Sequence, residues 1–230
     1  LLALWERQAM PAGAALVAVG GFGRGELFPY SDVDVLVLLP EGASTEPVES
    51  LITACWDVGL EIGSSVRTVT ECVDEARRDV TIQTALLESR PIAGARKTYA
   101  AFREATDAAL DPAAFLRAKQ LEMQQRHVKF EGTPYALEPN CKESPGGLRD
   151  LQVILWIARV AGLGTNWREL GARGVITRPE AAMLGKREVL LQNIRVRLHL
   201  ADASVLPAIP ATTITLPVMA NAHRIATETP

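Results

Sequence analysis

The chain has 230 residues, of which 48% are hydrophobic, so it is long enough to form the cores of two modest domains. Its net charge of −3 and pI near 5.7 argue against a general nucleic-acid-binding protein, because affinity for a phosphate backbone depends on an excess of Lys and Arg. No apolar run approaches the roughly 18 residues that a membrane-spanning helix needs. We therefore expect neither a nucleic-acid partner nor a membrane association.

The cysteine content indicates a reducing compartment. Cys55, Cys72 and Cys141 are odd in number, lie far apart and form no CxxC pair. This pattern predicts neither a disulfide framework nor a zinc site. A cytoplasmic location is the resulting expectation.

The first part of the chain alternates between apolar runs and glycine or proline turns. A helix over residues 4–10 is predicted to stop before Pro11, and residues 15–19 read as a buried strand. A Gly-Gly turn follows, and residues 24–28 are predicted to form one helical turn. Residues 33–39 are almost continuously apolar, which predicts a second strand that is buried on both faces.

The alternation continues to about residue 95. Residues 46–58 are predicted to be a helix that ends at Gly59, and residues 60–69 a third strand. Thr68 and Glu71 have the spacing of a capping box for the next helix, and another helical segment covers residues 82–88. Strands that alternate with helices predict a compact α/β domain over residues 1–95.

From residue 96 onward the pattern is helical. Helices are predicted over 99–109, 112–130, 148–160 and 177–201, with a loop rich in Pro and Gly at 131–147. We therefore predict an all-α domain over residues 96–203. Residues 204–230 contain four prolines and five threonines but only two charged side chains, and we interpret them as an irregular or disordered tail.

Two aspartates at the start of the second strand carry the main chemical signal. Asp32 and Asp34 are separated by one valine, so in a strand both side chains project from the same face. Adjacent carboxylates repel each other, and a divalent cation would offset that repulsion. Mg²⁺ is usually bound by one or two carboxylates plus substrate phosphates. Glu61, on the third strand, would complete a second metal site or deprotonate an acceptor hydroxyl.

The segment before the aspartates offers candidate phosphate donors. Gly20 and Gly21 leave backbone N–H groups accessible, Arg24 can add a charged contact, and Ser31 can donate its hydroxyl. Each feature alone has a simpler interpretation: an ordinary tight turn, a capped loop end, or, for Glu61, a solvated strand residue. The combination of turn, paired acids and third acid is more specific than any part.

Charged residues of the helical region have two interpretations. Lys142 and Arg149 are candidate substrate-binding residues, although surface charge at a loop and a helix start is the commoner role for such side chains. His127 and His199 have no partner at metal-ligand spacing, so we interpret both as structural.

Three segments resemble a known family. Residues 20–38, GGFGRGELFPYSDVDVLVL, resemble the bacterial PII uridylyltransferases of the DNA polymerase β-like nucleotidyltransferase superfamily. Residues 137–159, LEPNCKESPGGLRDLQVILWIAR, resemble the segment that opens a helix in the helical domain of that family, and residues 60–72 resemble its strand with the third acid. The resemblance implies an α/β nucleotidyltransferase domain, with a mixed sheet and flanking helices, followed by an all-α helical domain.

The resemblance also implies an activity and partners. It implies Mg²⁺-dependent transfer of UMP from UTP to a tyrosine hydroxyl of the PII nitrogen-regulatory protein, with release of pyrophosphate. By motif position, Gly20 and Gly21 correspond to the phosphate turn, Asp32 and Asp34 to the metal-binding pair, and Glu61 to the third acid. The implied partners are UTP and PII.

Two departures and two alternatives qualify this expectation. Family members usually have histidine where this chain has Ser64, and the resemblance stops after Leu200. The family continues with a hydrolase domain and sensory domains, so we expect no uridylyl-removing activity and no glutamine sensing from this chain. The alternatives are an adenylyltransferase that acts on a protein such as glutamine synthetase, and an inactive fragment that only binds PII.

Overall fold

The computed structural model describes residues 1–28, 31–130 and 140–205, and the chain divides into two compact units, Leu1–Asp111 and Pro112–Pro230. The elements of the first unit are α1 (Leu2–Arg7), β1 (Ala15–Ala18), α2 (Gly20–Arg24), β2 (Val33–Leu38), α3 (Glu46–Asp57), β3 (Ile62–Arg67), α4 (Val69–Arg78), α5 (Val80–Leu87), β4 (Arg90–Gly94) and α6 (Arg96–Ala108). Those of the second unit are α7 (Pro112–Lys129), α8 (Leu148–Val160), α9 (Trp167–Ala172) and α10 (Arg178–Val205). None of the described helices is both long and apolar enough to cross a membrane.

The first unit is built on a four-stranded mixed sheet in the order β3-β2-β1-β4. β1 runs antiparallel to β2 and to β4, whereas β2 and β3 are parallel. The parallel pair follows from its connection, because a parallel neighbour requires a crossover segment and α3 supplies it. The predicted mixed sheet with flanking helices is thus confirmed. β4 was not predicted, and Pro91 is tolerated within it because β4 is an edge strand.

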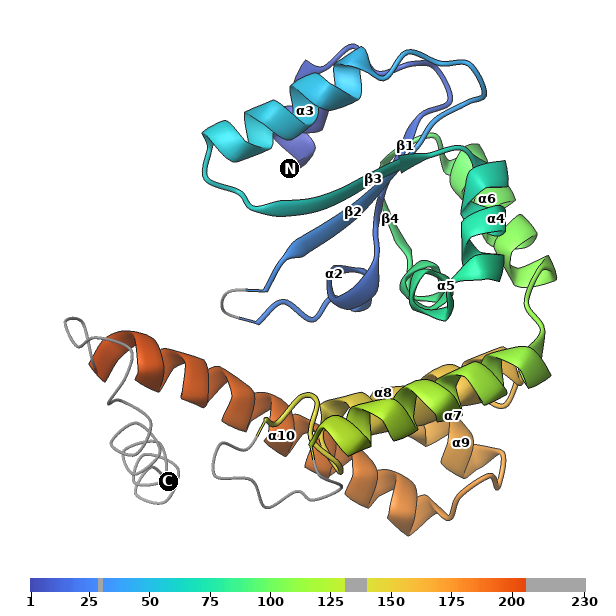
Figure 1. The fold of residues 1–230 in the computed structure, drawn as a ribbon, viewed down its shortest axis with the longest axis vertical. Helices are drawn as coiled ribbons and strands as arrows, with labels where there is room; N and C mark the ends of the chain where they lie inside the picture. Colours follow the sequence, from blue (N-terminus) through green and yellow to red (C-terminus); the bar gives the residue numbers. More distant parts are fainter. Residues whose placement is uncertain (29–30, 131–139, 206–230) are drawn as a thin grey trace. The chain divides into compact units, whose positions relative to one another are not determined.

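Helices cover both faces of this sheet (Figure 1). Leu16 of β1 and Val35 of β2 pack with α1 and α3, whereas Val17 and Leu36 pack with α4, α5 and α6. Adjacent strand residues therefore enter different cores, as the period of two requires. Burial on both faces explains why the strands read as continuous apolar runs.

Local signals placed most helices correctly. The capping box at α4 is present, with the Glu71 amide 3.2 Å from Thr68 Oγ1 and the Thr68 amide 2.8 Å from Glu71 Oε2. The short helix after β1 lies four residues earlier than predicted, because Gly25, at φ 78°, ends it in a left-handed conformation. The contact division falls at residue 111 rather than at the predicted 95, because Phe102 of α6 packs in the core with β1 and α4.

In its described part, the second unit is helical and contains no strand. The starts of α7, α8 and α10 agree with the prediction to within one residue. α9 was not predicted, although Asn166 caps it by accepting a 3.0 Å hydrogen bond from the Glu169 amide. Ala158, Trp167, Leu170 and Ala181 form a core that joins α8, α9 and α10. Residues 204 and 205 of the predicted tail belong to α10, and the rest of the tail lies outside the described residues.

Candidate active site

The predicted acids lie at the start of β2. Asp34 is the second residue of the strand and is half-buried. Asp32 is exposed and lies one residue before the strand begins. Leu36 and Leu38 belong to the core against α4, α5 and α6, so the alternation of the strand places Asp34 on this same face. The amide of Val19, at the end of β1, donates a 3.1 Å hydrogen bond to the Asp34 carbonyl, which fixes the head of the strand.

The carboxylate of Asp34 lies between two glycines. The register of β2 and β3 pairs Asp34 with Gly63, and a Cβ atom at Gly63 would lie 2.4 Å from Asp34 Oδ1. A Cβ atom at Gly20, where φ is +56°, would lie 3.4 Å from Oδ2. The two oxygens therefore occupy space that side chains at these positions would fill. Sequence reasoning selected Gly20 but missed Gly63. Only the pairing of β2 with β3, which places Gly63 opposite Asp34, could have identified it.

The third predicted acid precedes β3. Val33 and Ile62 form the first pair of the β2–β3 ladder, so Asp32 and Glu61 each lie one residue before it, and both are exposed. Among the described residues, no group of three or more His, Cys, Asp or Glu side chains is placed to hold a metal ion. Glu61 as a third metal ligand therefore stays a prediction. Ser64 pairs with Val35, which places it on the opposite face from Asp34.

Arg24 is engaged by carboxylates. Its Nε atom lies 2.9 Å from Glu26 Oε2, and its Nη1 atom bonds Glu88, whose side chain is only 5% exposed. A nearly buried carboxylate needs such a cation, because an unpaired charge away from water is costly. The guanidinium thus joins α2 to the end of α5, and a contact with a phosphate would have to compete with these two pairs.

Ser31 and Arg90 shape the chain around α2. Ser31 is bonded to Phe28 twice, since its Oγ accepts from the Phe28 amide at 3.3 Å and its amide donates to the Phe28 carbonyl at 3.0 Å. Arg90 of β4 donates to the carbonyls of Phe22 at 3.0 Å and Gly23 at 3.3 Å. These carbonyls lie at the end of α2, where a cation is favourable. Sequence reasoning did not identify this role of Arg90.

In the second unit, Asp150 joins α7 to the start of α8. Its Oδ1 lies 2.6 Å from Arg126 Nη2, both of its oxygens lie 3.0 Å from His127 Nε2, and Oδ2 accepts from the Gly146 amide at 2.7 Å. Burial raises the pKa of Asp150, but the hydrogen bonds from Arg126, Gly146 and His127 outweigh it and hold the pKa below 3.8. The structural interpretation of His127 agrees with this pairing. The side chain of His199 lies outside the described residues.

Lys142 and Arg149 share one carboxylate. Lys142 Nζ lies 3.6 Å and Arg149 Nη2 3.2 Å from Glu143 Oε1. Arg149 also donates to Gln152 Oε1 at 3.1 Å, and its guanidinium lies over the Trp156 ring, 5.4 Å from the ring centroid. These contacts hold Arg149 in one orientation at the second position of α8.

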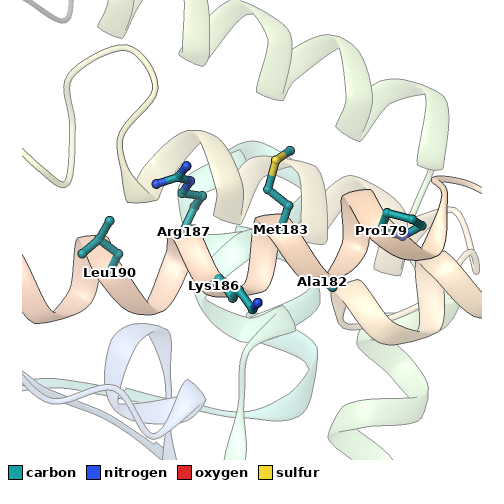
Figure 2. Close-up of a pocket in the computed structure, with 6 residues that line it drawn as sticks. All are labelled: Pro179, Ala182, Met183, Lys186, Arg187 and Leu190. Atoms are coloured by element: carbon teal, nitrogen blue, oxygen red, sulfur yellow. The ribbon is translucent and has the colours of Figure 1, made fainter.

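A separate hollow lies along α10 (Figure 2). Its lining residues are Pro179, Ala182, Met183, Lys186, Arg187 and Leu190. All six come from this single helix, so the hollow contains none of the predicted site residues.

Comparison with known proteins bears on both units. Residues 3–88 match the family model described as a nucleotidyltransferase domain, and residues 114–206 match the model described as GlnD PII-uridylyltransferase. The first match spans β1, β2 and β3 with the paired aspartates, and the second spans most of the described helical unit.

Curated relatives agree over most of the chain. A bifunctional uridylyltransferase/uridylyl-removing enzyme of Cupriavidus pinatubonensis is 63% identical over 199 residues, which cover 85% of this chain and 23% of that protein. An enzyme of the same name from Burkholderia mallei is 58% identical over 202 residues, which cover 86% of this chain and 24% of that protein. The chain thus spans about a quarter of the length of these relatives. Together, the two model matches and this identity show that the chain belongs to the PII-uridylyltransferase family.

Proposed function

We propose that the first unit contains the site that transfers UMP from UTP to a tyrosine hydroxyl of a PII protein. The observation that supports this most directly is the position of the Asp34 carboxylate, beside Gly20 and Gly63 and two residues from Asp32. The family of the chain supports the choice of UTP and PII over other nucleotides and acceptors.

Asp32 and Asp34 are proposed as the ligands of a divalent metal, with Mg²⁺ as the specific ion. Their donor set fits, because Mg²⁺ takes oxygen ligands and usually needs only one or two carboxylates besides substrate phosphates. The two glycines leave the room that the Asp34 oxygens occupy, so the carboxylate lies beside α2 and β3 at the head of β2. When bound, the metal would neutralise charge on the triphosphate.

The proposed reaction is a displacement at the α-phosphorus of UTP. The tyrosine oxygen forms a bond to this phosphorus, the bond to the bridging oxygen of the β-phosphate breaks, and pyrophosphate leaves. Glu61, exposed before β3, is proposed to accept the phenolic proton. Gly20 and Gly21 occupy the first two positions of α2, where backbone N–H groups lack partners within the helix, and we propose that they and Ser31 donate to phosphate oxygens.

Arg24 is proposed to contact a substrate phosphate only when one of its two ion pairs, with Glu26 or Glu88, opens.

A cytoplasmic location fits the three cysteines, which are all free. Burial raises the pKa of Cys72 to about 12, so that thiol is not poised for reaction.

The test is transfer of label to purified PII. The chain would be incubated with PII, Mg²⁺ and UTP labelled at the α-phosphate, and in parallel with ATP labelled likewise. Label from UTP but not ATP is expected, together with loss of label when the acceptor tyrosine is replaced by Phe. Label from ATP alone would indicate an adenylyltransferase instead. A folded chain that transfers neither label would overturn the proposal and favour a fragment that only binds PII.

A further inference from the structure

The junction between loop residues 140–147 and α8 contains more basic than acidic groups. Glu143 lies within 4 Å of three cations: Lys142 at 3.6 Å, Arg149 at 3.2 Å, and Arg126, whose Nε is 3.8 Å from Oε2. Asp150, bound to Arg126 at 2.6 Å, is the second carboxylate. We call these five residues the basic junction. Three Lys or Arg side chains therefore share two carboxylates.

The position of the basic junction makes this excess unfavourable. Arg149 is the second residue of α8, and the N-terminus of a helix carries partial positive charge that disfavours cations. The backbone N–H groups at this helix start are not free to bind an anion. The amide of Leu148 donates to the Cys141 carbonyl at 2.9 Å, and that of Arg149 donates to the Lys142 carbonyl at 2.8 Å. An anion that bound here would be held by side chains.

The buried side of the basic junction has an unused donor. The Arg126 side chain is only 10% exposed, and its Nε is a buried atom with no hydrogen-bond partner among the described residues. A buried N–H without a partner is costly and rare in native structures. This Nε lies 3.8 Å from Glu143 Oε2, and Nη1 of the same guanidinium donates to the Glu143 carbonyl at 2.9 Å.

The local charges support the same conclusion. Burial and the charges of Arg149 and Arg195 hold the pKa of Lys142 below its usual value, although Glu143 acts in the opposite direction. Arg195, on α10, therefore adds positive potential at the basic junction. Within the basic junction itself, the two carboxylates offset two of the three cationic charges.

We propose that the basic junction binds an oligophosphate anion, with Arg149 and Lys142 as ligands and Glu143 as an internal counter-anion that the ligand displaces. A guanidinium fork matches a phosphate bidentately, and a Lys ammonium provides a compact charge beside it. Arg149 is already oriented by Gln152 and Trp156, so little side-chain freedom is lost on binding. The site lies entirely in the second unit and does not depend on the transfer reaction proposed above.

The test is calorimetric titration of the full chain with inorganic pyrophosphate, with EDTA present to remove divalent metals. Arg149→Gln and Lys142→Gln should each weaken binding by about tenfold or more, because each removes a charge-assisted contact. Glu143→Gln should tighten binding, since the competing carboxylate is gone. Arg168→Gln, which removes an exposed cation on α9 of the same unit, should bind as the unchanged chain does.

Further titrations identify the source of the phosphate. UTP that binds much more tightly than UMP would indicate a nucleotide triphosphate, whereas pyrophosphate that binds more tightly than UTP would indicate the released product. Thermal unfolding checks that each variant is folded. Lys142, whose side chain is 39% exposed, can be changed with the least risk to folding, so it decides the outcome if Arg149→Gln unfolds.

Unchanged affinity in Lys142→Gln would overturn the proposal. So would equal weakening in Arg168→Gln, which would indicate nonspecific charge attraction, or weaker binding in Glu143→Gln. Because binding is measured without metal and without PII, a failed transfer assay does not affect this result.

Discussion

Gly63 lies directly across from Asp34 in the parallel β2–β3 pair, so close that a Cβ atom there would be 2.4 Å from Asp34 Oδ1. The neighbouring strand thus leaves room for a carboxylate at the head of β2. The third strand, β3, was predicted to place the acid Glu61 at the site. In the structure, β3 places Gly63 beside Asp34, and this glycine has no side chain to displace the carboxylate.

Replacing Gly63 should impair the proposed activity more than the fold. Gly63→Ala forces the Asp34 carboxylate to move, and the obstructed atom is the end of a side chain rather than backbone. Misplacement of about 1 Å at a reacting centre can reduce the rate by roughly a hundredfold. We expect kcat/KM for UMP transfer to fall by about that factor, while the denaturant midpoint changes little.

The matched control is Gly185→Ala, within α10, where the nearest atom to a new Cβ would be Trp167 Cδ1 at 3.8 Å. It should leave transfer unchanged and be neutral or slightly stabilising, because Ala favours helix over Gly by about 1 kcal/mol. Full activity in Gly63→Ala would show that the position of Asp34 does not matter for transfer.

Removing either aspartate should abolish transfer without unfolding the chain. Asp32→Asn and Asp34→Asn each delete a proposed metal ligand, and a bound metal contributes several kcal/mol of transition-state stabilisation, so a loss of at least about a hundredfold is expected. Stability should change little, because one of two mutually repelling charges is removed. The measurements are label transfer from UTP and urea unfolding. Asp74→Asn, an exposed position on α4, is the control that should keep full activity; variants that unfold would instead indicate a structural role.

Gly23 should be intolerant of any side chain. A Cβ atom there would lie 2.1 Å from the Glu88 carbonyl oxygen and 3.0 Å from that of Ala18, both of which are backbone atoms that cannot rotate away. Overpacking of this kind typically costs about 1–3 kcal/mol. Gly23→Ala should therefore lower the free energy of unfolding of the first unit by at least this amount, measured by chemical denaturation. A variant as stable as the unchanged chain would contradict the close approach of α2 to the end of α5.

Asp150 should make the second unit sensitive to acid. The pKa of Asp150 is lowered in the folded chain, so its contribution to stability is present above the ordinary value of 3.8 and is lost as the pH falls below it, through the folded-state pKa. Asp150→Asn should cost about 1–3 kcal/mol at neutral pH, because Arg126 loses its charged partner, and the loss should shrink at low pH.

The comparison for Asp150 is Asp107→Asn, which removes an exposed i,i+4 partner of Arg103 and should cost less than about 1 kcal/mol. Urea unfolding at neutral pH and near pH 3 measures both variants. An Asp150→Asn effect that stays constant with pH would show that the carboxylate charge is not responsible.

Much of the fold could be predicted because its signals are local. The apolar runs of β1 and β2, the Thr68–Glu71 capping box and the start of α8 each depend on residues that are close in sequence. β4 could not be predicted in the same way. Its sequence contains Pro91 and little apolar content, and it becomes a strand only because β1 offers a free edge to pair with.

The candidate site likewise has features that depend on residues close in sequence and features that depend on distant ones. The sequence by itself determined that Asp32 and Asp34 lie two residues apart at the head of one apolar strand and follow a glycine-rich segment, because the apolar run and the spacing of residues are local properties. Only the tertiary structure decided that Gly63 makes room for Asp34, that Glu88 holds Arg24, and that Asp150 joins Arg126 and His127. These partners are brought together by strand register and helix packing, and those arise from cores to which many distant residues contribute at once.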